Sequence, residues 1–154
     1  LDAETLACAD YPGYIDPDDN RYLKPNTPQS LMIDRVAENT RELGFRAPES
    51  KGEYMVAIYR GLAKAYAKAI KHLESITGKS YANLHIIGGG CKNEILDQWS
   101  ADETGLTVYA GPIEATALGN ILVQSVATGT ISSLQEGRSH IINRQKVKRF
   151  DPRS

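Results

Sequence analysis

The sequence predicts an α/β fold in which long helices pack on a short parallel sheet. Between residues 84 and 128, apolar strand-like runs alternate with helical patterns, an order typical of parallel strands joined by crossover helices. A long apolar stripe at helical spacing precedes them, over residues 50–78. Three consecutive glycines, residues 88–90, stand between the first strand-like run and the helix that follows it.

The first segment, residues 1–27, is expected to be a turn-rich lead-in. The stretch YPGYIDPDDNRYLKPNTP contains four prolines, each of which fixes φ and removes a backbone donor. Asp16, Asp18 and Asp19 could be imagined as a metal site. Asp-Pro-Asp-Asp is also ordinary turn chemistry, in which carboxylates accept from nearby N–H groups. The turn is the favoured interpretation, and no metal-binding residue is assigned.

The core is expected to span residues 28–128, beginning with two helices. The first is predicted over 29–43 and ends at Gly44. The second begins with a capping box of Ser50 and Glu53, ends at Gly78 and would be about 40 Å long. The apolar residues expected to face the core from this second helix are Met55, Ile58, Tyr59, Leu62, Tyr66, Ile70, Leu73 and Ile76.

A βαβα unit follows, with strands at 84–87 and 106–110 and helices at 93–103 and 114–128. Asn93 is expected to cap the first of these helices and Gly105 to end it. Two parallel strands need neighbours and cover on both faces. The sheet is therefore expected to be incomplete, with apolar surface exposed on its first strand and on the long helix.

The last segment, residues 129–154, is expected to be a C-terminal tail. A weak strand pattern, HII, occurs at residues 140–142. The end of the tail, NRQKVKRFDPRS, is basic and polar, and we expect it to be frayed. The first residue is Leu1 instead of Met, so the chain is expected to be a piece of something longer.

Composition excludes several classes of function. Eighteen basic and nineteen acidic residues give a net charge of −1, which argues against a nucleic-acid-binding protein. No apolar run approaches the roughly 20 residues that a membrane span requires. Cys8 and Cys91 lie far apart, and the N-terminus shows no secretory signal. Both are expected to be free thiols in a reducing compartment, which predicts a cytoplasmic protein.

The glycine run is the segment that points most directly at chemistry. A strand that turns into a helix through glycines aims backbone N–H groups at one point and attracts anions, most often a nucleotide phosphate. The dinucleotide fingerprint is a poor match, because its sixth position is Asn93 and the next strand ends at Tyr109 and Ala110. The common phosphate loop fails, because Lys92 is followed by Asn93. On physical grounds two interpretations stay open: anion binding, or tight packing of the strand on the helix.

The segment GGGCKNEILDQWSADETGLTVYAGPIEATALGN resembles the adenosine-binding segment of the FGGY carbohydrate kinases, which are actin-like ATPases with a ribonuclease-H-like fold. Within that family, AGPIEATALGN, DPDDNRYLKP and the SKGEY helix start are similar to the rhamnulokinases. The resemblance covers roughly residues 14–128. The positions that match the family pattern are Gly89, Gly90, Asn93, Gln98, Ala101, Asp102, Gly105, Val108, Glu114, Leu118 and Gly119.

The resemblance implies ATP as the cofactor. Carried over by position, Gly89 and Gly90 would lie against the adenosine and α-phosphate, with Gly88 and Asn93 completing the turn. A side chain at residue 90 would then collide with the ligand or force a disallowed backbone shape.

Three nearby residues have more ordinary interpretations. Glu114 is as suited to the dipole of the last long helix as to a nucleotide contact. Gly119 is expected to allow close helix packing. Cys91 is expected to be packed and inert, although a thiol near a helix start can have a lowered pKa.

The resemblance also implies what this chain lacks. The family's catalytic Asp and the loops that hold the β- and γ-phosphates, and with them most of the Mg²⁺ site, belong to an N-terminal domain. Residues 1–154 are therefore interpreted as the C-terminal, adenosine-binding portion of a sugar kinase, with no catalytic residue and no turnover alone. Its expected partners are that missing domain or a second copy of itself.

The implied reaction of the intact enzyme is transfer of the γ-phosphate of ATP to L-rhamnulose, giving L-rhamnulose 1-phosphate. Two alternatives remain. The first is a kinase for another ketose, such as fuculose or xylulose. The second is a non-catalytic nucleotide-binding or interaction domain.

Overall fold

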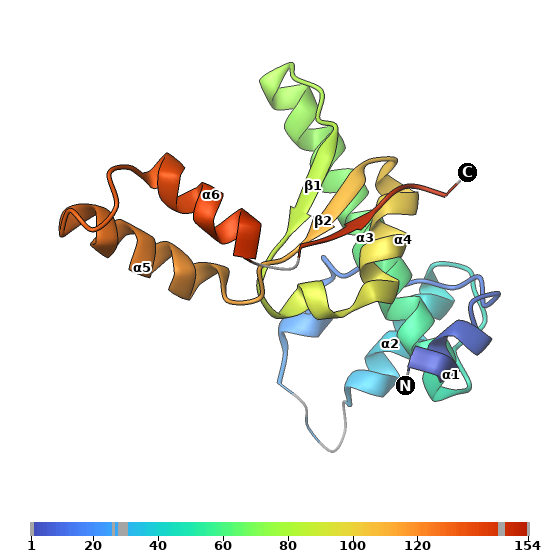
Figure 1. The fold of residues 1–154 in the computed structure, drawn as a ribbon. Helices are drawn as coiled ribbons and strands as arrows, with labels where there is room; N and C mark the ends of the chain where they lie inside the picture. The colour runs from blue at the N-terminus through green and yellow to red at the C-terminus, as the bar shows by residue number, and fades with distance from the viewer. Residues whose placement is uncertain (1, 26, 28–30, 145–146, 154) are drawn as a thin grey trace.

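The computed structural model describes residues 2–25, 27, 31–144 and 147–153. Helix α4 packs on a small sheet and α3 packs on α4, α1 and α2 lie at one end, and α5 and α6 form a hairpin that extends away from the body (Figure 1). The elements are α1 (Asp2–Ala7), the 3-10 helix η1 (Asn20–Leu23), α2 (Met32–Glu42), α3 (Lys51–Thr77), β1 (Asn83–Ile86), the 3-10 helix η2 (Gly88–Lys92), α4 (Glu94–Thr104), β2 (Thr107–Ala110), α5 (Ala115–Ala127), α6 (Leu134–Arg144) and β3 (Lys148–Phe150).

The sheet has the order β1-β2-β3 and confirms the predicted α/β class. β1 and β2 are parallel, with Leu84 opposite Val108, as the βαβ pattern predicts. β3 adds to the other side of β2 in the antiparallel sense, with Val108 opposite Phe150. The sheet is therefore mixed, and β1 stays at its edge.

The prediction of a frayed C-terminal end was wrong. Asp151 follows β3 and accepts a hydrogen bond from Thr107 Oγ1 at 2.9 Å, and Arg153 forms an ion pair with Asp102 at 2.7 Å. Burial opposes ionisation of Asp102, but hydrogen bonds from Arg153 and Gln98 outweigh it and lower the pKa of this carboxyl. The strand suggested at 140–142 was also wrong, because those residues lie in α6.

The N- and C-caps confirm most of the predicted helix boundaries. Ser50 Oγ accepts from Glu53 N at 3.2 Å, and Glu53 reaches back to Glu49 N at 2.7 Å. α3 ends at Gly78 and α4 at Gly105, both in the left-handed conformation that a helix stop favours. The predicted start of the α2 helix at residue 29 lies outside the described residues.

The buried face of α3 differs from the predicted stripe. Of the eight apolar residues expected in the core, Tyr59 is buried, whereas Leu73 and Ile76 are exposed. The residues that α3 does bury are mostly small: Gly52, Val56, Ala57, Tyr59, Gly61, Ala63 and Ala67. The hydrophobic pattern pointed to the larger side chains, but the helix uses its small ones where other segments approach closely.

The close approach brings the N-terminal segment directly onto α3. A Cβ added at Gly61 would fall well inside contact distance of the Ile15 carbonyl oxygen, and one at Gly52 would meet the Glu4 carbonyl in the same way. Ile15 N also donates to Ala57 O at 3.2 Å. The turn-rich lead-in is therefore part of the core, as are α1 and the buried ring of Tyr11.

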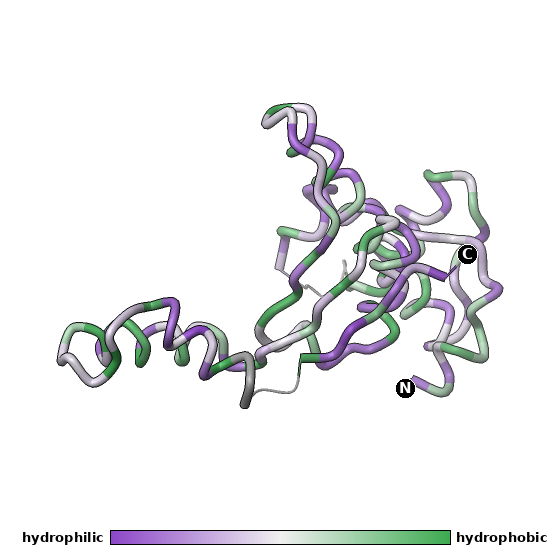
Figure 2. Tube along the Cα trace, turned by 45° about the horizontal axis from the view of Figure 1, so that its top comes forward, coloured by the Kyte–Doolittle hydropathy of each residue, from purple (hydrophilic) through white to green (hydrophobic). Residues whose placement is uncertain are grey.

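The α5–α6 hairpin has its own close contact. A Cβ at Gly137 of α6 would lie 2.7 Å from the Leu122 side chain of α5. The expected packing role of Gly119 was wrong, because no atom of the described residues lies within 4 Å of a Cβ at this position. Apolar residues such as Ile121 and Val123 are exposed on the hairpin, whose green stretches stand apart from the body in Figure 2.

Asp97, in the first turn of α4, is fully buried, and neither carboxylate oxygen has a hydrogen-bond partner among the described residues. Burial, with a smaller contribution from Glu94, raises the pKa of Asp97 to about 6, while Lys148 opposes the shift. A buried carboxylate without hydrogen bonds is costly when ionised. Folding therefore makes this side chain easier to protonate than it is in the unfolded chain.

The close contact at Gly61 predicts opposite effects for two Gly→Ala changes. Gly61→Ala is expected to lower the free energy of unfolding by about 1–3 kcal/mol, because the added methyl displaces the Ile15 backbone. Gly119→Ala is expected to raise it by about 1 kcal/mol through helix propensity alone. Urea denaturation of both variants measures the difference, and equal stabilisation by both would contradict the packing described.

Asp97 predicts a pH-dependent effect on stability. Because its folded pKa lies above the ordinary value, its favourable contribution is complete below about pH 4 and is lost as pH rises through about 6. Asp97→Asn is expected to raise the free energy of unfolding at pH 8 by up to about 3 kcal/mol, with little effect at pH 4. The exposed Asp34→Asn is the matched control, and denaturation curves across this range should show no such pH dependence for it.

Candidate functional site

The glycine turn sits where β1 leaves the sheet. Instead of entering α4 directly, the chain makes one turn of 3-10 helix, η2, and only then reaches Asn93. Gly88 has φ +77°, a conformation that favours glycine, and its N–H donates to Pro112 O at 3.1 Å. Gly111 N donates to Ile86 O at 2.8 Å. These bonds fix the turn to the segment that leaves β2.

Gly89 and Gly90 are exposed, and packing does not account for their lack of side chains. A Cβ at Gly89 would meet nothing within 4 Å, and one at Gly90 would reach only Ile86 Cγ2, at 3.7 Å. Neither residue has a positive φ. The backbone at these two glycines is open, and tight packing of the strand on the helix does not explain them.

Asn93 holds the end of the turn. Its Oδ1 accepts a hydrogen bond from Leu96 N at 3.1 Å, which caps α4 as predicted. Among the described residues, nothing accepts a hydrogen bond from its side-chain amide group, which carries two N–H donors. The structure thus brings the four predicted binding residues, Gly88, Gly89, Gly90 and Asn93, into one continuous turn.

A cavity of about 290 Å³ adjoins this turn at the carboxyl ends of β1 and β2, the edge at which parallel sheets commonly bind ligands. Its basic groups are Lys92 of η2 and Lys148 of β3, and Lys148 also pairs with Glu94. The lining residues are Cys91, Lys92, Glu94, Ala110, Gly111, Ile113 and Lys148.

Lys148 was missed by the sequence analysis. It belongs to the end of the chain that was expected to be frayed, and its position depends on the pairing of β3 with β2. The segment KVKRF has neither an alternating apolar pattern nor a turn before it that would indicate a hairpin. A contact this distant in sequence leaves no local signal.

The structure also shows the contacts of the three other candidate residues, which are Cys91, Glu114 and Cys8. Cys91 is buried, and its thiol donates to Gly88 O at 2.9 Å, which supports the packed interpretation. Glu114 occupies the N-cap position of α5, is exposed, and makes no capping hydrogen bond through its side chain. Cys8 is a free thiol like Cys91.

The aspartates of the lead-in serve as turn residues. Asp16 Oδ1 accepts from Asp18 N at 3.1 Å, and Asp19 Oδ1 accepts from Arg21 N at 2.8 Å, starting η1. Across the described residues, no three His, Cys, Asp or Glu side chains come together as a metal site would require. Within the same residues, none of the helices combines the length and the apolar character of a membrane crossing.

Comparison with known proteins shows which family this chain is similar to. The sequence pattern of the FGGY family of carbohydrate kinases, C-terminal domain, matches residues 6–128. The chain is 41% identical to the rhamnulokinase of Halalkalibacterium halodurans over 136 residues, covering 88% of this chain and 28% of that protein. It is also 41% identical to the rhamnulokinase of Bacillus subtilis, covering 91% and 28%. The chain thus spans less than a third of the length of these relatives.

The fold agrees with that assignment. The crystal structure of gluconate kinase from Lactobacillus acidophilus superimposes with a TM-score of 0.52 at 16% identity, covering 98% of this chain and 33% of the kinase chain. At that identity the likeness concerns the fold alone. The family pattern over residues 6–128 shows that the chain belongs to the FGGY family of carbohydrate kinases, in their C-terminal domain.

Proposed function

We propose that this chain forms the adenosine side of the ATP site in a sugar kinase that phosphorylates L-rhamnulose to L-rhamnulose 1-phosphate. The observation that carries the proposal is the 41% identity to two rhamnulokinases over about nine-tenths of the chain. The geometry of the glycine turn adds support, because it leaves open space where a ligand would lie. Kinases for fuculose or xylulose are the alternatives within the same reaction class.

The proposed nucleotide-binding residues are Gly88, Gly89, Gly90 and Asn93. The bare backbone at Gly89 and Gly90 admits the adenosine and α-phosphate at close range, since no Cβ occupies the space. Gly88 gives the turn its left-handed bend, and Asn93 fixes the start of α4 while offering its amide donors. ATP, when bound, supplies the phosphoryl group. Lys92 and Lys148 lie on the adjoining cavity and would attract its phosphates.

The chemical step needs groups from outside the described residues. These residues hold no cluster of carboxylates suited to Mg²⁺. We assign Mg²⁺ coordination and the catalytic base to an N-terminal domain, which would also provide most of the sugar contacts, and we expect no turnover by this chain alone. The proposed partners are ATP, the sugar, and that domain or a second copy, with no nucleic acid and no membrane, in the cytoplasm.

One different class of function remains as an alternative. A nucleotide-binding or interaction domain without catalysis would use the same glycine turn. Mixing the chain with a rhamnulokinase N-terminal domain separates the two: restored phosphorylation of L-rhamnulose supports the kinase. Nucleotide binding without restored activity supports the non-catalytic domain.

The open glycine backbone predicts how nucleotide affinity responds to substitution. Gly90→Val is expected to fold, because only Ile86 lies near its new side chain, but to weaken ATP binding by at least about tenfold. Amide chemical-shift titration with ATP and with ADP provides the measurement. Gly119→Val adds the same atoms on exposed α5 and is expected to bind like the unmodified chain.

Two outcomes count against the proposed site. The first is an amide spectrum that neither nucleotide changes. The second is a Gly90→Val variant with the affinity of the unmodified chain.

The exposed apolar surface predicts self-association. The expected exposure is seen at Ile87, just after β1, and at Leu73 and Ile76 of α3. Further apolar residues of α2 and α3, including Met32, Ile33 and Met55, line a groove of about 210 Å³. Sedimentation velocity is expected to show assembly that increases with concentration. A compact monomer at every concentration tested would contradict this expectation.

A further inference from the structure

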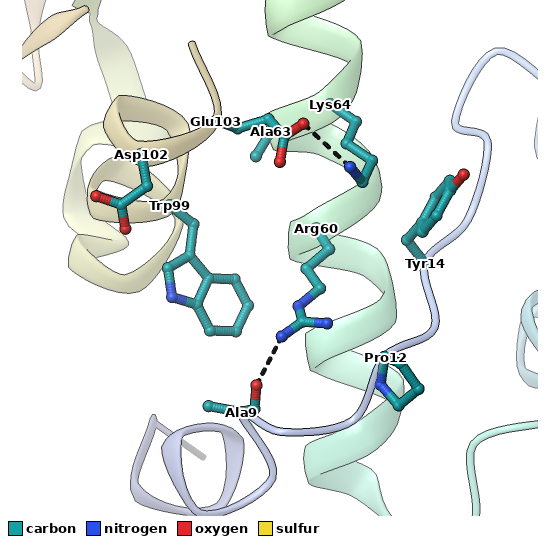
Figure 3. Close-up of a pocket in the computed structure, with 9 residues that line it drawn as sticks. All are labelled: Ala9, Pro12, Tyr14, Arg60, Ala63, Lys64, Trp99, Asp102 and Glu103. Atoms are coloured by element: carbon teal, nitrogen blue, oxygen red, sulfur yellow. Dashed lines mark hydrogen bonds and ion pairs between the residues drawn. The ribbon is translucent and has the colours of Figure 1, made fainter. Parts of the chain in front are cut away.

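A second cavity lies away from the glycine turn, between the N-terminal segment, α3 and α4 (Figure 3). It has a volume of about 470 Å³, within the range of small-molecule sites, and shares no lining residue with the cavity at the turn. α3 contributes Arg60, Ala63 and Lys64, and α4 contributes Trp99, Asp102 and Glu103. The N-terminal segment closes it with Ala9, Pro12 and Tyr14.

Arg60 is a cation that pairs with no carboxylate of the described residues. Its Nη2 donates to Ala9 O at 2.7 Å, and its guanidinium carbon lies 5.8 Å from the centroid of the Trp99 ring. No carboxylate among the described residues forms an ion pair with it, whereas Arg46 and Arg153 each have one. Figure 3 shows the guanidinium extending into the cavity between Trp99 and Pro12. A guanidinium in this state favours a carboxylate or phosphate.

Two aromatic rings flank this charge. Trp99 is held in place by an edge-on contact with Tyr59, with ring centroids 6.4 Å apart. Tyr14 stands across the cavity, with Lys64 Nζ 5.1 Å from its ring centroid. A flat aromatic face beside a cation suits a ligand that combines a ring having an apolar face with an anionic group.

The rim carries two carboxylates that are already paired. Asp102 binds Arg153, and Glu103 binds Lys64 at 3.0 Å. Asp102 already accepts hydrogen bonds from Gln98 and from Arg153 on both of its oxygens, whereas Glu103 Oε2 can still accept from a ligand hydroxyl. The same two charges disfavour a ligand with several negative groups, such as a nucleoside triphosphate. An uncharged sugar, in turn, would leave Arg60 without a counter-ion.

We propose that this cavity binds a sugar phosphate: the phosphate on Arg60, the apolar face of the sugar ring on Trp99, and a hydroxyl toward Glu103. The site is separate from the proposed ATP site and does not depend on it. It requires neither nucleotide nor turnover.

The sequence contains a single tryptophan, so Trp99 reports directly on this cavity. The unmodified chain is titrated with D-fructose 1-phosphate in the absence of nucleotide, with Trp99 emission as the readout. A saturable change is expected below about 10 mM. D-fructose alone and inorganic phosphate alone are expected to bind at least about tenfold more weakly, because each satisfies only part of the site.

Arg60→Met keeps the aliphatic length and removes the charge, and it is expected to weaken binding of D-fructose 1-phosphate by at least about tenfold. Arg41→Met, on the exposed face of α2, is the matched control and is expected to leave binding unchanged. If Arg60→Met does not fold, an NMR titration of the unmodified chain still tests the proposal. The resonances to follow are the indole N–H of Trp99 and the amide of Ala63. Both are expected to shift with D-fructose 1-phosphate while residues 88–92 do not.

Three results would overturn the proposal. The first is emission that D-fructose 1-phosphate leaves unchanged. The second is inorganic phosphate that binds as tightly as the sugar phosphate. The third is an Arg60→Met variant with full affinity. Where that variant does not fold, shifts confined to residues 88–92 take its place as the third result.

Discussion

The rest of the structure depends on the contact between the N-terminal segment and the small-residue face of α3. Gly61 and Gly52 let the backbone at Ile15 and Glu4 lie directly on the helix, closer than any side chain would allow. That contact turns a proline-rich, irregular segment into one wall of the core. It positions Tyr11 and Ile15 against Val36 and Val56, so that α2 and α3 share one apolar cluster. The same α3 then supports α4, whose first residue follows the glycine turn.

The two ends of α4 lie beside different sites. Its N-terminus begins at Asn93, beside the open backbone of Gly89 and Gly90, where the proposed nucleotide would lie. Toward its C-terminus, Trp99 faces the cavity that we assign to a sugar phosphate. Between them, Asp97 is buried and has no hydrogen bond from any residue that the structure describes, which is an energetic cost close to the glycine turn. Protein cores seldom contain a carboxylate without a hydrogen bond. Where such a carboxylate occurs, it often lies near a functional site.

Much of the fold could be predicted because it is encoded locally. Ser50, Asn93, Gly78 and Gly105 mark helix ends through hydrogen bonds or φ values that involve neighbouring residues only. The parallel pair of strands followed from alternation of strand and helix patterns. What could not be predicted depends on distant contacts: the buried face of α3 was set by the segment that packs on it, and β3 by its pairing with β2. The four glycine-turn residues were found because they are consecutive or nearly so. Lys148 was not, because its place at the site depends on the long-range pairing of β3.

The α5–α6 hairpin has one further consequence. Its two helices pack on each other through Gly137 and Leu122, and they extend from the body that contains α3 and the sheet (Figure 1). A part whose main contacts are internal can open without unfolding the remainder. Amide hydrogen exchange should therefore divide the protein into two cooperative units, with α5 and α6 exchanging together and earlier than α3 and α4. A partner that binds the hairpin would slow amide exchange in α5 and α6, while the exchange rates of α3 and α4 would stay unchanged.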